Sequence, residues 1–173
     1  MLIRYGMLGK KVWFCLLGLM LAGCQGYPRS LNLPYDAGGR GVNTPASELS
    51  PQMVGDYLIL VSDRKGSQDV FLFDMAQRQL IDLPGLNSLD ASVNDPTISE
   101  DGRYIAYMSS RLGLADIYVY DRDTGLTQNL TETLQAEVRR PVISANGEAI
   151  AFEANEDGRW NIRVYDRQGN ALD

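Results

Sequence analysis

The chain has 173 residues, a net charge of −6 at pH 7, two cysteines and no histidine. Without histidine, a Ser-His or Cys-His pair, a histidine metal ligand and an imidazole proton shuttle are all excluded. The acidic balance disfavours binding to nucleic acid, so we expect no nucleic-acid partner. The length that remains after any export signal suits one domain with its own core.

Residues 1–23 have the pattern of a bacterial export signal. Basic residues precede the apolar stretch Val12–Ala22, which is too short to span a bilayer. The stretch ends in Leu-Ala-Gly-Cys, which resembles the lipobox of lipoproteins and implies lipidation of Cys24; an uncleaved N-terminal anchor is the alternative. Cleavage before Cys24 would remove three positive and no negative charges and leave a net charge of −9.

Residues 24–42 are rich in glycine and proline, which predicts a loose tether between a membrane and a folded head. The alternative is that Leu31–Tyr35 packs on the head as an extra edge strand. Gln25 follows Cys24, so the aspartate associated with retention in the inner membrane of enteric bacteria is absent. An outer-membrane destination is therefore favoured, although a Gram-positive surface would also fit a lipobox.

The remaining residues, 43–173, contain an internal repeat. The sequence SEDGRYIAYMSSRLGLADIYVYD (Ser99–Asp121) returns 45 residues later as SANGEAIAFEANEDGRWNIRVYD (Ser144–Asp166), and QMVGDYLILVSDRKGSQDVFLFD (Gln52–Asp74) matches it 47 residues upstream. Self-similarity at this period is typical of a repeat architecture.

Each copy predicts four short strands. A proline-containing segment comes first, most weakly at residues 43–45, and a tight turn such as Asp101-Gly102 follows. Two apolar runs and a short final segment complete the copy. The runs are nearly continuous, as in YLILV and YIAYM, so both faces of these strands require burial. Stacked four-stranded blades satisfy this requirement, and the fold class predicted is all-β and β-propeller-like.

The pattern P-x-x-S-x-(D/N)-G-x-x-I-A-(Y/F), followed by D-I-Y-V-x-D, resembles the propeller repeat of TolB-like periplasmic proteins. This resemblance covers residues 43–173 and implies a periplasmic binding or scaffold head that engages protein partners. The chain supplies about three blades, whereas closed propellers have about four to eight. It could form half of a dimeric six-bladed ring, dock on another blade-containing protein, or remain an open stack.

Two polar features of the repeats are interpreted as having no ligand-binding role. Residues 121–125, DRDTG, look like a calcium loop but lack its later ligands, so a turn is the better explanation. Arg64 and Arg111 occupy one repeat position and are interpreted as solvated charges. We expect no metal and no cofactor.

Residues that break the repeat are better candidates for binding. Trp160 and Arg163 replace Ala115 and Tyr118, and an exposed tryptophan beside an arginine is typical of a binding hot spot. Arg139 and Arg140 form the only adjacent arginine pair of the head and could bind a carboxylate. The alternatives are that the first pair adapts the last copy to an edge, and that the second is a solvated turn.

The sequence therefore favours a non-catalytic lipoprotein of the cell envelope whose head binds a protein, with a Tol-type envelope or biopolymer-transport component as one candidate. It would be anchored through Cys24 in the periplasm. The alternatives are a carbohydrate-active enzyme, the accessory propeller domain of a hydrolase, or a structural assembly subunit. No serine, lysine or carboxylate pair stands out as catalytic.

Overall fold

The structure of the chain is a computed structural model, which describes residues 39–111 and 114–172. Contacts divide the chain into two units, Met1–Leu33 and Pro34–Asp173, and all described residues belong to the second. The predicted signal, Cys24 and residues 24–38 of the predicted tether lie outside the described residues.

The described residues form eleven strands in three antiparallel sheets, which we call blades 1, 2 and 3. Blade 1 contains β1 (Glu48–Val54), β2 (Tyr57–Ser62), β3 (Asp69–Asp74) and β4 (Gln79–Ile81). Blade 2 contains β5 (Ser92–Ile98), β6 (Tyr104–Arg111), β7 (Leu114–Asp121) and β8 (Leu126–Asn129). Blade 3 contains β9 (Glu137–Ile143), β10 (Ala149–Glu156) and β11 (Arg159–Asp166).

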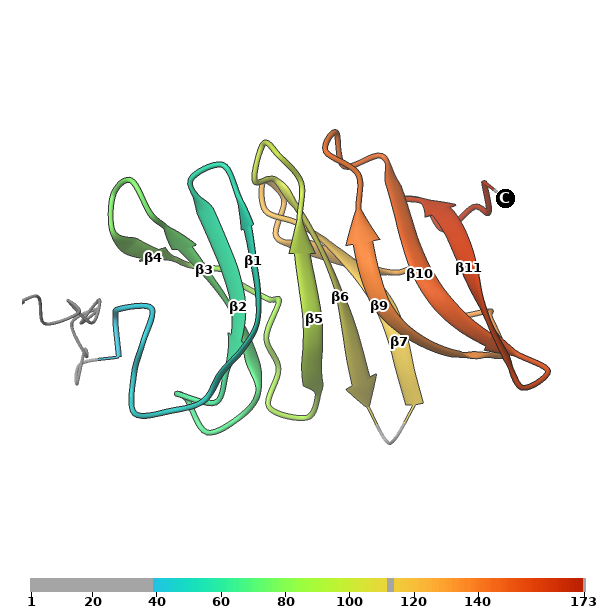
Figure 1. The fold of residues 1–173 in the computed structure, drawn as a ribbon, viewed down its shortest axis with the longest axis horizontal. Helices are drawn as coiled ribbons and strands as arrows, with labels where there is room; N and C mark the ends of the chain where they lie inside the picture. Colours follow the sequence, from blue (N-terminus) through green and yellow to red (C-terminus); the bar gives the residue numbers. More distant parts are fainter. Residues whose placement is uncertain (1–38, 112–113, 173) are drawn as a thin grey trace, which may run out of the picture. The chain divides into compact units, whose positions relative to one another are not determined.

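Consecutive strands pair within each blade, as in a meander, and the blades lie side by side in chain order (Figure 1). The inner strand of each later blade packs against the blade before it: β5 contacts β1, β2 and β3, and β9 contacts β5, β6 and β7. The prediction of an all-β, propeller-like stack of about three blades is confirmed. Within the described residues blade 3 has three strands, and a single bridge between Tyr165 and Ala171 adds to its outer edge.

Each inner strand contains a β-bulge before a proline. Ser50, Asp95 and Arg140 have φ angles of 47, 48 and 51° and precede Pro51, Pro96 and Pro141, respectively. Two residues there oppose one on the neighbouring strand, which bends the inner strand. The prediction that residues 43–45 are the first proline-containing strand is wrong, because the bulge identifies Pro51 as the equivalent proline.

Two apolar cores lie between the blades, and they explain the continuous apolar runs. In β6, Ile105 belongs to the core between blades 1 and 2, while its neighbour Ala106 belongs to the core between blades 2 and 3. Both residues are 0% exposed. Burial of apolar area from both faces of the middle strands is thus the main stabilising contribution of the stack.

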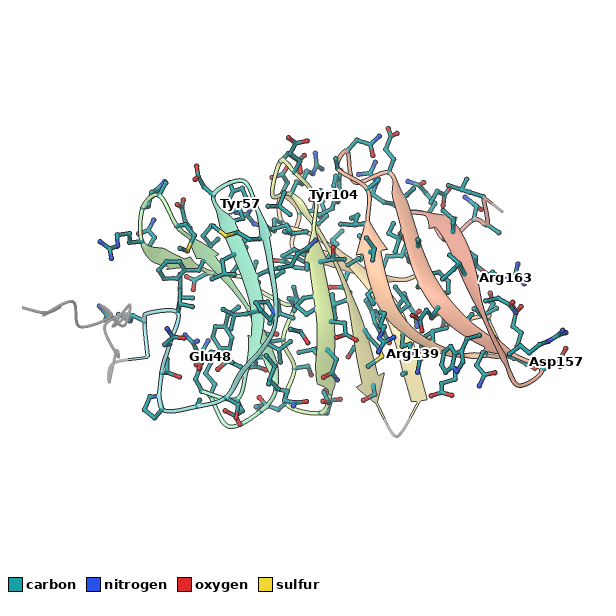
Figure 2. All side chains as sticks on the ribbon, in the orientation of Figure 1. Glu48, Tyr57, Tyr104, Arg139, Asp157 and Arg163 are labelled. Atoms are coloured by element: carbon teal, nitrogen blue, oxygen red, sulfur yellow. The ribbon has the colours of Figure 1, made fainter. Side chains whose placement is uncertain are left out.

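A repeated joint connects neighbouring blades at one end. The tyrosine that begins the second strand of one blade lies against the turn glycine of the next blade, and an arginine of that next blade covers its ring. Figure 2 shows Tyr57 and Tyr104 at the same end of their blades. The two joints consist of Tyr57 with Gly102 and Arg122, and of Tyr104 with Gly147 and Arg167.

The face of blade 1 that points away from blade 2 is partly covered by the segment that leads into β1 (Figure 1). The Arg64 guanidinium donates to the carbonyls of Gly39, Gly41 and Val42 at 3.3, 2.8 and 3.0 Å and to Glu48 Oε1 at 3.1 Å. Its side chain is only 5% exposed, so the interpretation of Arg64 as a solvated charge is wrong. Residues 39–42 of the predicted tether are attached to blade 1 by this clasp.

The clasp depends on one substitution in the repeat. Glu48 occupies the position at which blades 2 and 3 have the buried Val93 and Val138. Its carboxylate accepts hydrogen bonds from the backbone N–H and the hydroxyl of Thr44 as well as from Arg64. At this end of the stack, Glu48 therefore replaces a core valine and binds the segment that leads into β1.

Candidate functional site: the exposed face of blade 3

The side chains of blade 3 divide between two faces because successive residues of a strand point to opposite sides. Ile150, Phe152 and Ala154 of β10 point toward blade 2 and are buried. The residues between them belong to the opposite face. The strand register places three rows across that face: Val142, Ala151 and Val164; Arg139, Glu153 and Ile162; Asn155 and Trp160.

This face has the apolar residues of a contact between blades, but none of the described residues covers it. Ile162 is 63% exposed, whereas the equivalent Ile117 of blade 2 is 0% exposed. Val142 is 59% exposed and Trp160 is 37% exposed. Exposed apolar side chains that gather on one sheet face indicate an interaction surface.

A charged cluster crosses the middle of the face. Arg139 Nε donates to Glu153 Oε2 at 2.6 Å, and Arg140 Nη1 donates to Glu153 Oε1 at 3.3 Å. The hydrogen bond from Arg139, with a further contribution from Arg140, holds the pKa of Glu153 below its ordinary value. The Arg139 guanidinium also lies 3.7 Å from the centre of the Trp160 ring. Three of the four candidate binding residues thus meet around one carboxylate.

The fourth candidate residue lies elsewhere. Trp160 and Arg163 are three residues apart on β11, so they point to opposite faces, and Arg163 is on the side of Phe152. Arg163 forms an ion pair of 2.8 Å with Glu156. The predicted Trp160–Arg163 pair is therefore wrong, and Arg139 is the arginine beside the tryptophan. The contact between Arg139 and Trp160 depends on how β9, β10 and β11 pair with one another. The sequence of β11 alone does not contain this information.

A second surface feature runs along the inner strands. The residues at the three bulges line a shallow groove of about 370 Å³, and Ser50 Oγ donates to Asp95 Oδ1 at 3.1 Å between blades 1 and 2. The bulge positions carry a hydroxyl, a carboxylate and a guanidinium on the same backbone geometry. Sequence reasoning missed this row because the first proline had been assigned to the wrong residue.

The predicted turn at Asp121 is formed as expected. Its carboxylate accepts hydrogen bonds from Arg103 at 3.0 and 2.9 Å and from the backbone N–H of Asp123 at 2.9 Å. The hydrogen bond from Arg103 holds the pKa of Asp121 below its ordinary value.

In residues 39–111 and 114–172, no group of three or more acidic, cysteine or histidine side chains could hold a metal ion. The same residues contain no helix long and apolar enough to cross a bilayer.

Comparison with solved structures identifies propeller proteins. TolB from Acinetobacter baumannii matches with a TM-score of 0.59 and 21% identity, over 75% of this chain and 32% of that protein. A protein assigned as TolB from Agrobacterium tumefaciens matches with a TM-score of 0.54 and 22% identity, over 66% of this chain and 40% of that protein. The chain thus spans about a third of the first and two fifths of the second.

The propeller domain of a protease is also similar to this chain. The β-propeller domain of the Trilobed protease from Pyrococcus furiosus, with an open velcro topology, matches with a TM-score of 0.55 and 16% identity, over 74% of this chain and 42% of that chain. No family model and no curated protein sequence matches the chain. The similarities show a TolB-like propeller fold.

Proposed function

We propose that this TolB-like propeller stack is a non-catalytic, lipid-anchored head that binds a protein partner in the cell envelope. The observation that carries the proposal is the exposed face of blade 3. Ile162 occupies a position that is buried in both earlier blades, as Val70 and Ile117, yet 63% of its surface is accessible. Burial of one such aliphatic side chain contributes about 1.5–3 kcal/mol.

The face also has the chemistry of a protein-binding hot spot. Trp160 and the two arginines are of the residue types that dominate binding energy, and they lie to one side of the apolar row of Val142, Ala151 and Val164. Glu153 keeps the guanidinium groups in place, which lowers the entropy cost of binding. A partner strand with apolar side chains and a carboxylate fits this surface.

The proposed location at the outer membrane rests on sequence features that lie outside the described residues. The signal pattern, Cys24 and Gln25 support export, lipidation and an outer-membrane destination. The structural similarity to TolB proteins fits a periplasmic head, and a Tol-type envelope component is the partner class that we propose.

Site-specific photocrosslinking in intact cells tests the proposal. A crosslinking side chain placed at Ile162 is expected to give an adduct with a protein, which mass spectrometry identifies. The control position is Leu126 of blade 2, which is 70% exposed and lies outside the blade 3 face. Absence of an adduct at Ile162, or equal adducts at both positions, would contradict the proposal.

A second candidate is the accessory propeller domain of a hydrolase, which the similarity to the Trilobed protease propeller supports. It predicts that the Ile162 adduct contains a hydrolase. An enzyme acting through its own carboxylates would instead turn over a glycoside or a peptide substrate, and one Asp or Glu substitution would abolish that activity. Turnover of this kind by the purified chain would reject the non-catalytic function.

A further inference from the structure

A cleft lies between blades 2 and 3, at the end of the blades where Tyr104 packs on blade 3. Its volume is about 600 Å³, and its walls come from β6, β7, β8 and the turn that follows β11. Val119 in this cleft is only 5% exposed, whereas Leu126 on β8 is 70% exposed. The cleft is thus an accessible space with an apolar part, and it is separate from the outward face of blade 3.

The arginine of this cleft is held in position but lacks an anionic partner. The Arg167 guanidinium lies 4.0 Å from the centre of the Tyr104 ring. With the residues that the structure describes, it forms neither a hydrogen bond nor an ion pair. The equivalent Arg122 of blade 2, by contrast, donates to the carbonyl of Gly102. Arg167 therefore presents a planar group of donors, which binds carboxylates through parallel hydrogen bonds.

The carboxylate of the cleft, in contrast, already has its partners. Asp121 accepts two hydrogen bonds from Arg103 and one from the backbone N–H of Asp123. The charged group of the cleft that still lacks a partner among the described residues is the guanidinium of Arg167. An anionic ligand is therefore favoured over a cationic one.

An amide in the same cleft adds a hydrogen-bond acceptor. Gln128 on β8 donates from Nε2 to the carbonyl of Gln168 at 2.9 Å, and this bond connects blade 2 with the turn after β11. It fixes the amide, whose Oε1 accepts no hydrogen bond from the described residues. Leu126 lies two residues before Gln128 and thus on the same face of β8. An acceptor and an apolar side chain therefore lie beside each other in the cleft.

We infer that this cleft binds a carboxylate that is adjacent to an N–H group and an apolar side chain. This is the chemistry of an apolar C-terminal residue of a peptide and of an N-acylated amino acid. Arg167 binds the carboxylate, Oε1 of Gln128 accepts from the N–H, and Leu126 contacts the apolar side chain. The ring of Tyr104 and the carbonyl of Gln168 hold the two polar groups in position, which lowers the entropy cost of binding.

Titration of the full chain with N-acetyl-leucine, followed by methyl NMR of its leucines, tests the site. We expect the Leu126 methyl signals to shift and those of Leu89, which is 93% exposed outside the cleft, to stay unchanged. N-acetyl-leucinamide, which lacks the carboxylate, should bind at least about tenfold more weakly. 4-Methylpentanoate lacks the N–H and N-acetylglycine lacks the apolar side chain, and each should bind about two- to tenfold more weakly. No shift at Leu126, or equal affinities of the acid and its amide, would overturn the site.

A pair of arginine variants tests the role of the guanidinium. Arg167→Gln should weaken binding of N-acetyl-leucine at least about tenfold. Arg159→Gln, at an exposed arginine of β11 outside the cleft, should leave the affinity unchanged. Equal effects of the two variants would contradict the assignment of Arg167. The series of ligands keeps the test valid if Arg167→Gln fails to fold, because it requires no variant.

The source of the ligand is identified by a photocrosslinking side chain at Thr124, which is exposed and lines the cleft. A protein adduct in intact cells that is attached at its C-terminal residue identifies a protein end. An adduct of low mass identifies a short peptide or an acylated amino acid. An adduct attached through the interior of a protein chain would overturn the recognition of a terminal carboxylate. The Ile162 adduct reports separately on the blade 3 face, so failure of one site leaves the other testable.

Discussion

Replacement of Gly102 by alanine should destabilise the stack much more than the same replacement at Gly55. Both glycines lie in the turn between the first two strands of their blades, with φ angles of 71 and 55°. Gly102 lies against the ring of Tyr57, whereas the Cβ position at Gly55 has no described neighbour within 4 Å. Both variants place a Cβ at a positive-φ turn position, and only the Cβ at Gly102 meets a ring, so the difference between them reports on the joint.

The magnitude has two parts. An alanine in the left-handed region costs about 1–2 kcal/mol, and this cost is nearly common to the two variants. At Gly102 the new Cβ would also lie 2.7 Å from Cζ of Tyr57, well inside van der Waals contact, so the ring must move. Overpacking of this kind costs about 1–3 kcal/mol. We expect Gly102→Ala to lose about 1–3 kcal/mol more than Gly55→Ala.

Equilibrium unfolding in urea, followed by circular dichroism on a soluble form that begins at Gln25, measures this difference. Unchanged m-values would show that both variants unfold over the same surface. The double variant Gly102→Ala/Tyr57→Ala should lose less stability than the sum of the losses in the two single variants, because the clash disappears with the ring. Equal losses in the two single variants, or strict additivity in the double variant, would refute the role of the ring at the joint.

Three further predictions concern Arg64, Asp121 and Cys24. Arg64→Ala leaves Glu48 partly buried without its cation and should cost about 3 kcal/mol in urea unfolding; no loss would show that the clasp adds no stability. The folded pKa of Asp121 lies below the ordinary value of 3.8 because of Arg103, so its stabilising effect is present above about pH 4 and disappears as the pH falls below it. Asp121→Asn should therefore be less stable at pH 6 and lose less stability on acidification; parallel pH profiles would contradict this. Cys24→Ala should move the protein from the membrane to the soluble fraction of cells, and an unchanged distribution would argue against lipidation at this residue.

The sequence predicted the blades because their signals are local. The repeat, the glycine turns and the continuous apolar runs each reflect a single strand or hairpin, and the three blades lie where these signals predict them, except for the first inner strand. The position of the first inner strand was missed because Pro45 and Pro51 both follow polar residues. Only pairing with β2 distinguishes them, since Pro51 lies in the bulge opposite Leu60.

The surfaces were less predictable because they depend on residues distant in the sequence. Trp160 and Arg139 stand out individually, but their contact of 3.7 Å requires the register of two strand pairs. The burial of Arg64 depends on a segment 22–25 residues upstream that has no strand pattern of its own.

At the proline bulges, the backbone conformation does not depend on the charge of the side chain. Ser50, Asp95 and Arg140 adopt nearly the same φ although one is neutral, one acidic and one basic. Charge along the inner edge can therefore change by a single substitution per blade while the strand keeps its bend and its register. Such an edge can diverge in specificity faster than the cores behind it, because Ser50, Asp95 and Arg140 are not part of the apolar cores between the blades.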